Sequence, residues 1–200
     1  MNQSPADYLD KIAPQAPKRQ LFQLNLRNVI FLAIGIVILV IIMVVIANAI
    51  GGGKNTPWQQ LSLRLTNTEK VTSAAGSSIK NSQLRSLNSE VKIYLTNTQR
   101  DLATPFKTVG VTPKKIPASI TKSEATRDTE MTTRLETARF NAKYDSAYAR
   151  EMSYQLSGIL ALYQQLHSQS GPNTKKTLET AYNNLLPTQK AIAEFSASNE

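Results

Sequence analysis

Side chains able to bind metals are few in this 200-residue chain, which contains one histidine, His167, and no cysteine. A di-metal carboxylate site in a helical bundle needs inward-facing carboxylates together with Glu-x-x-His pairs, but Gln164 stands three residues before His167. Six glutamates lie outside the apolar stripes of the helical patterns, and we expect them to form a solvated face. They are Glu69, Glu90, Glu124, Glu130, Glu136 and Glu151. The sequence therefore predicts no metal centre and no cofactor.

Catalysis by a nucleophile or by paired acids has little support. No G-x-S-x-G motif is present, and a Ser-His pair would have to use His167 as its base. Nothing in the pattern places two carboxylates in one cleft for glycoside cleavage, and the absence of cysteine excludes thiol chemistry. We expect His167 to be exposed near a helix C-terminus, where a partial charge is mildly favourable. The chain is predicted not to be an enzyme and to have no catalytic or cofactor-binding residues.

Lysines form the clearest candidate contact surface. The net charge of the chain is +9, and 19 basic and 12 acidic residues follow from Lys54 onward. The aromatic residues do not alternate with basic ones as a nucleic-acid stacking surface requires, so nucleic acid is not an expected partner. Anionic lipid headgroups or cell-wall polymers suit this charge, and solubility alone is the simpler explanation. The candidate residues are Lys107, Lys114, Lys115 and Lys122, with Lys175 and Lys176 as further members.

One apolar run predicts on which side of a membrane these lysines lie. From Val29 to Ala47 there is no charge, no proline and no strongly polar side chain. As a helix rising about 1.5 Å per residue the run would extend about 28 Å, close to the hydrocarbon thickness of a bilayer. Four basic and two acidic residues precede it, which favours a cytoplasmic N-terminus and an exterior C-terminal part. A buried core helix and a signal peptide cleaved after Ala49 are the alternatives.

The remaining elements follow from the spacing of apolar residues. We expect a cytoplasmic leader at 1–28, a transmembrane helix at 29–50, a glycine-rich linker at 51–56 and a helical domain at 57–200. Thr56, with Pro57 and Gln59, is predicted to cap the first exterior helix, and Pro187 to kink or break the last one. Strand patterns are nearly absent. Helices are expected at 56–76, 81–103, 120–138, 145–168 and from 172 onward.

These patterns predict an all-α fold class, a single transmembrane helix followed by an antiparallel four-helix bundle. The segment 120–138 is polar for its length, with few apolar residues to bury. We therefore expect it to be an extra, short or partly irregular helix.

Three short motifs between residues 57 and 197 resemble a known family. They are Ile116-Pro117 before the third expected helix, Tyr144-Asp145-Ser146-Ala147-Tyr148 at the start of the fourth, and Leu186-Pro187 within the last. In these motifs the chain resembles exported bacterial helical domains of unknown function (domain of unknown function family 4142), and the resemblance implies a ferritin-like bundle. Members of that family often have histidines where this chain has Leu156 and Ile192. The departure weakens any ligand-binding role that those histidines would support.

Physical chemistry alone gives the motif residues structural roles. Asp145, near a helix N-terminus, is suited to accept hydrogen bonds from free backbone N–H groups and to interact with the positive end of the helix dipole. Tyr144 and Tyr148 are one turn apart and can pack on the same face.

The favoured function is a non-catalytic, membrane-anchored, extracytoplasmic helical bundle that acts as an interaction or envelope-associated module. Its expected partners are the lipid bilayer and anionic lipid headgroups or wall polymers, and the sequence does not identify a protein partner. The alternative is a ferritin-like metal-handling protein or a carrier that binds a small ligand, which rests on analogy of fold.

Overall fold

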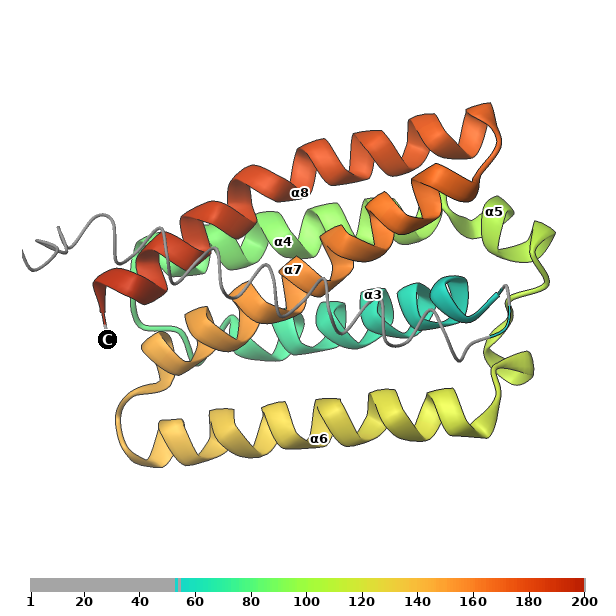
Figure 1. Cartoon of the computed structure of the whole chain (residues 1–200). Helices are drawn as coiled ribbons and strands as arrows, with labels where there is room; N and C mark the ends of the chain where they lie inside the picture. The colour runs from blue at the N-terminus through green and yellow to red at the C-terminus, as the bar shows by residue number, and fades with distance from the viewer. Residues whose placement is uncertain (1–52, 54, 200) are drawn as a thin grey trace, which may run out of the picture. The chain divides into compact units, whose positions relative to one another are not determined.

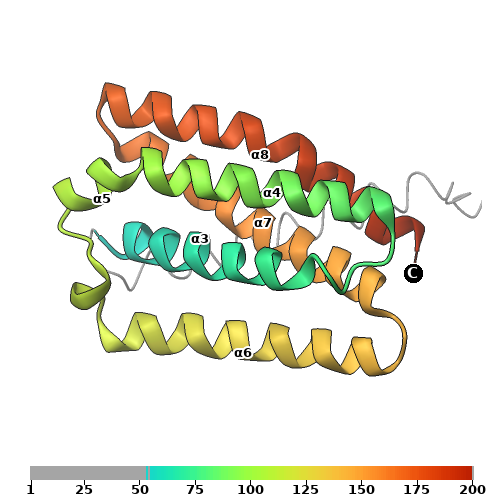
Figure 2. The same cartoon turned by 180° about the vertical axis from the view of Figure 1, so that it is seen from behind.

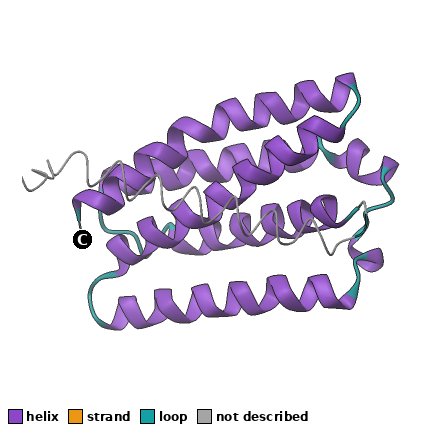
Figure 3. Ribbon diagram, viewed as in Figure 1, coloured by secondary structure: helices purple, strands orange, loops and turns teal. Residues whose placement is uncertain are grey.

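The computed structural model describes residue 53 and residues 55–199, and every regular element in that part of the chain is helical (Figure 3). The predicted all-α class is confirmed for these residues. The expected span at 29–47 and the leader before it lie outside them, and no described helix is long and apolar enough to cross a membrane. The elements are α3 (Thr56–Ala75), α4 (Ser82–Asp101), α5 (Ala103–Thr108), a 3-10 turn η1 (Pro113–Lys115), α6 (Ala118–Phe140), α7 (Tyr144–Gln169) and α8 (Pro172–Ser198).

Four long helices surround one apolar core. Helices α3, α4, α8 and α7 pack side by side in that cyclic order, and each runs antiparallel to its neighbours (Figures 1 and 2). The apolar stripes predicted for the second, fourth and fifth helices supply most of the core. Complete burial of a leucine stabilises the fold by about 1.5–3 kcal/mol. Among the most buried apolar residues are Leu61, Leu65, Leu84, Val91, Leu95, Leu156, Ile159, Leu178, Leu185 and Ile192.

Helix α6 is a full-length fifth helix, packed against α3 and α7 on the outside of the bundle. The prediction of a short helix at 120–138 is therefore wrong, because α6 has 23 residues, more than the 20 of α3. The prediction was based on the lack of apolar residues, and only Met131 and Leu135 are buried apolar side chains of α6. Ion pairs and a hydrogen bond from Asn67 to Asp128 add polar attachment.

The first ion pair joins α6 to α3. The Arg64 guanidinium donates to the Glu124 carboxylate from Nε at 3.0 Å and from Nη2 at 2.9 Å, and Glu124 is only 4% exposed. Nη1 of Arg127 lies 3.8 Å from Oε2 of Glu124, the oxygen that accepts from Nε of Arg64. A Cβ atom at Gly158 of α7 would lie 3.1 Å from Nη1 of Arg64 and 3.3 Å from Nη2 of Arg127. Glycine at this position therefore leaves room for both guanidinium groups.

The second ion pair joins α6 to α7. Arg134 donates to both oxygens of Glu151, each at 2.8 Å, and Glu151 is 7% exposed. This hydrogen bonding is the main cause of the raised pKa of Arg134. The expectation that Glu124 and Glu151 belong to a solvated face is therefore wrong. Bidentate hydrogen bonds from arginine replace the hydrogen bonds to water that these carboxylates lose when they are buried.

One prediction about a helix end needs correction, and the kink or break predicted at Pro187 is not a break. The residue before the first helical position is Asn55 rather than Thr56, and no side chain caps α3, so the predicted capping box is wrong. Helix α8 continues through Pro187 without a break, although its ribbon bends along its length (Figures 1 and 2). Pro187 removes the donor for the carbonyl of Asn183, and since both residues are exposed, water can replace that donor.

Loss of the buried Arg64–Glu124 pair should destabilise the protein. We expect Arg64→Met to lower the free energy of unfolding by about 3 kcal/mol, because Glu124 would stay buried without its partner. Chemical denaturation followed by circular dichroism measures the change. Arg100→Met, which breaks an exposed pair with Asp101, should cost less than about 0.5 kcal/mol. Equal effects of the two variants would contradict the assigned role of the buried pair.

The environment of Asp128 predicts that the stability of the fold depends on pH. Burial, and then the nearby Glu124 carboxylate, raise the pKa of Asp128 above 3.8, although a hydrogen bond from Asn67 and the charges of Arg127 and Arg64 oppose the shift. A carboxyl group with a raised folded-state pKa contributes stability that is complete below pH 3.8, its pKa in the unfolded chain. This contribution is lost as the pH rises through the folded-state pKa.

Asp128→Asn removes this titration and keeps an oxygen that accepts from Asn67. The melting temperature of the variant should therefore increase relative to the wild type as the pH rises from 3.8 toward neutrality. Thermal melts of both proteins across this range test it. A difference that does not vary with pH would show that Asp128 titrates normally.

Candidate functional site

The predicted lysines gather at one end of the bundle, which we call the basic end. Helices α3, α6 and α8 begin there, and α4 and α7 end there (Figures 1 and 2). Five of the six lysines are exposed, and Lys175 is half-buried. The basic end comprises Lys107 of α5, Lys114 and Lys115 of η1, Lys122 of α6, and Lys175 and Lys176 of α8.

The charge at the basic end is largely uncompensated. The segment 103–123 contains four lysines and no acidic residue. None of the six lysines forms an ion pair with another described residue. Helices α3, α6 and α8 have no acidic side chain in their first turns, and the positive ends of their dipoles outnumber the negative ends of α4 and α7. This surface therefore attracts anions.

The segment that presents these lysines is held against the start of α3. Trp58 and Phe106 meet edge to face, with ring centroids 5.7 Å apart, and Val111 is 4% exposed. The side-chain amide of Asn55 donates to the carbonyl of Val109 at 3.0 Å. The connection between the helices expected at 81–103 and 120–138 thus contains α5 and η1 and is fixed in place. Asn55 also shows that the chain enters the bundle at the basic end.

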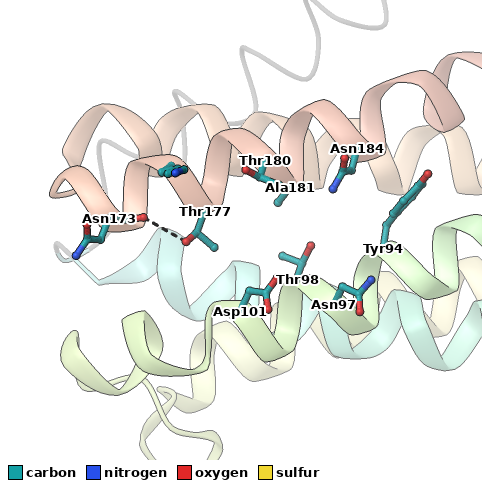
Figure 4. A pocket seen from close by; sticks show the side chains of 10 residues that line it. Tyr94, Asn97, Thr98, Asp101, Asn173, Thr177, Thr180, Ala181 and Asn184 are labelled. Atoms are coloured by element: carbon teal, nitrogen blue, oxygen red, sulfur yellow. Dashed lines mark hydrogen bonds between the residues drawn. The ribbon is translucent and has the colours of Figure 1, made fainter.

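A groove of about 350 Å³ runs between α4 and α8 beside the basic end (Figure 4). Thr98 and Ala181 are its buried members, and the other lining residues are exposed or half-buried. Of the residues that line it, the sequence analysis selected only Lys176 as a possible contact residue. The lining consists of Tyr94, Asn97, Thr98, Asp101, Asn173, Lys176, Thr177, Thr180, Ala181 and Asn184.

The lining residues form a periodic pattern in the sequence, although that pattern alone does not distinguish a groove from a solvated face. In α4 the lining positions are 94, 97, 98 and 101, and in α8 they are 173, 176, 177, 180, 181 and 184. Each set recurs at three- and four-residue steps and so lies on one face of its helix. Both sets are mainly polar and lie beside the apolar stripes.

Of the three motifs of the resemblance, Tyr144–Tyr148 lies at the opposite end of the bundle and makes structural contacts, while Ile116-Pro117 lies between η1 and α6 at the basic end. The Asp145 carboxylate accepts from the backbone N–H groups of Lys80 at 3.1 Å and Asn81 at 2.7 Å. Asp145 thus binds the turn before α4, although it lies in the first turn of α7. The rings of Tyr144 and Tyr148 stack with centroids 6.0 Å apart, as their spacing predicts.

Tyr148 connects three helices. Its hydroxyl donates to Oδ1 of Asn88 in α4, and Nδ2 of Asn88 donates to the carbonyl of Thr72 in α3 at 3.0 Å. Burial raises the pKa of Tyr148 well above its usual range, so the hydroxyl keeps its proton and remains a donor.

The other predicted positions are distributed through the fold. Leu156 and Ile192 are fully buried in the core. Leu186 is half-buried and Pro187 exposed, both within α8. His167 lies in the last turn of α7, as expected, but it is half-buried rather than exposed. The structure does not bring these residues to the basic end or to the groove.

Within residues 55–199 no three metal-binding side chains converge. Comparisons of the chain with models of protein families, with curated proteins and with solved structures found no match. The resemblance to a family of exported helical domains therefore stays a prediction, and the candidate site has to be interpreted from its own geometry.

The Tyr148 hydroxyl should contribute to stability through Asn88. We expect Tyr148→Phe to lower the free energy of unfolding by about 1–3 kcal/mol, because Oδ1 of buried Asn88 would lose its donor. Tyr182→Phe is the matched control, since the Tyr182 hydroxyl accepts from Gln164 at an exposed position. The control should change the free energy by less than about 0.5 kcal/mol. Denaturation curves that show equal losses would contradict the proposed three-helix link.

Proposed function

We propose that the protein is a non-catalytic, membrane-tethered helical bundle that docks through its basic end on anionic lipid headgroups. The supporting observation is that the chain enters the bundle at this end, through Gly53 and Asn55. The proposal takes the tether to be the apolar run 29–47, with the bundle on the exterior side as the basic residues before the run favour.

The length of the linker limits how far the bundle can move from the membrane. Seven residues separate Ala47, the last of the apolar run, from Asn55, and even if all of them, helix end included, were fully extended they would span at most about 25 Å. A tether this short keeps the bundle at a high local concentration beside the bilayer. Because the linker joins the basic end, this end is the one that the tether holds closest to the headgroups.

The charge supports the same partner. A lysine close to an anionic bilayer contributes about 1 kcal/mol, and the effect falls off within a Debye length of about 8 Å. Several exposed lysines that form no ion pair with a described residue can therefore hold the bundle against the membrane at low salt. Isolated contacts of this strength would not suffice without the tether.

Reactivity of individual lysines tests the proposal. The full chain is reconstituted in nanodiscs of phosphatidylcholine with or without phosphatidylglycerol, acylated briefly with an amine-reactive ester, and analysed by mass spectrometry. We expect phosphatidylglycerol to slow acylation of Lys107, Lys114, Lys115 and Lys122 several-fold, and added salt to reverse the effect.

Two exposed lysines at the opposite end, Lys80 and Lys143, are internal controls, and their rates should not change. Equal rates for the basic-end lysines in both lipids would overturn the proposal. Slowing of acylation by soluble teichoic acid, without any effect of phosphatidylglycerol, would assign the surface to wall polymers instead.

A further inference from the structure

We infer that the groove between α4 and α8 binds a short segment of hydroxyl-rich glycan. This inference goes beyond membrane docking and does not depend on it. The groove consists of side chains from two helices far apart in sequence that point toward a common space (Figure 4).

The groove exists because small residues face each other across the α4–α8 contact. Leu95 and Leu185 are buried side chains of the same two stripes. Beside the basic end their places are taken by Thr98 and Ala181, which are too short to fill the space. Farther along, the Thr188 hydroxyl donates to the Glu90 carboxylate at 3.1 Å and joins the helices. The open part is thus limited to the first turns of α8 and the last turns of α4.

The lining offers many hydrogen-bonding groups. Asn97, Asn173 and Asn184 have side-chain amides that form no hydrogen bond with another described residue, and each provides two donors and an acceptor. Thr177 donates to the backbone carbonyl of Asn173 at 3.2 Å. At the mouth of the groove Asp101 adds a carboxylate and Lys176 an ammonium group. Donors and acceptors are therefore mixed along the whole groove.

This mixture selects among ligand classes. A phosphate group needs donors, and the Asp101 carboxylate would repel it. An apolar ligand would leave the amides without water or partners, which is costly. A sugar hydroxyl both donates and accepts, so it can pair with an amide, a threonine hydroxyl or the carboxylate. The half-buried ring of Tyr94 offers an apolar face next to these groups, suited to the C–H face of a sugar ring.

Size and openness agree with part of a polymer. The groove volume of about 350 Å³ is near the lower end for ligand sites. Five of its ten lining residues are exposed and three more are half-buried, so a chain bound there could continue into solvent at either end. A short glycan segment fits this shape better than an enclosed small molecule does.

The test measures binding of two uncharged oligosaccharides, cellotetraose and chitotetraose, by isothermal titration calorimetry. The full chain is kept in an amine-oxide detergent, because a detergent with a sugar headgroup would compete for the groove. We expect saturable binding of at least one sugar. Binding of chitotetraose alone would show that the site requires an acetamido group, and binding of both would show that hydroxyl groups suffice.

Variants locate the site. Ala181→Leu places a larger side chain in the floor of the groove and should weaken binding at least tenfold. Ala197→Leu, at an exposed alanine near the other end of α8, is the matched control and should bind as the wild type does. Because Asn184 is exposed, Asn184→Ala cannot disrupt the core, and it should weaken binding about fivefold through a lost hydrogen bond. The Asn184→Ala variant therefore tests the site even if Ala181→Leu fails to fold.

Three results would overturn the inference. The first is no heat of binding with either sugar, and the second is equal affinity of wild type, Ala181→Leu and Asn184→Ala. The third is binding of a glycine-serine tetrapeptide as tight as that of the sugars, which would show a site for extended peptides. None of these measurements involves anionic lipid, so a negative result for glycan binding is distinguishable from a negative result for membrane docking.

Discussion

The fold depends on α7, which has to pack on two sides at once. It contacts α8 and α3 in the core and α6 on the outside, and 13 of its 26 residues are buried. Its core side can be apolar throughout, as Leu156 and Ile159 are. Its α6 side cannot, because α6 brings few apolar side chains. Charge pairing and close approach at Glu151 and Gly158 therefore replace apolar packing there, which makes the attachment of α6 specific in geometry.

The sequence was sufficient for the parts of the fold that rest on periodicity. The apolar stripes of α4, α7 and α8 predicted those helices and most of the core, because three- and four-residue spacing records directly which face is buried. The same reasoning failed for α6. Glu124 looks like a surface residue in any single-helix pattern, and its partner Arg64 is 60 positions away. Burial that depends on pairing between distant residues has no local signature.

The basic end and the groove also differ in how far the sequence could predict them. Exposed lysines in an acid-free segment could be selected by composition, and the connection between α4 and α6 places them at one end. The groove required knowledge that α4 and α8 are neighbours, since Thr98 and Ala181 are ordinary stripe residues until they face each other. Polar residues at helical spacing were present in both helices, but nothing local in the sequence separates a groove from a solvated face.

Topology brings the two surfaces together. Because α3, α6 and α8 all start at the end where the chain enters, that end collects the lysine-bearing connection, three positive dipole ends and the mouth of the groove. The groove follows α4 and α8 away from this end, from Asp101 and Asn173 toward Tyr94 and Asn184 (Figure 4). A tether at the same end would hold the mouth of the groove near the bilayer. A glycan that fills it would then have to lie within the narrow zone that a linker of seven residues can reach.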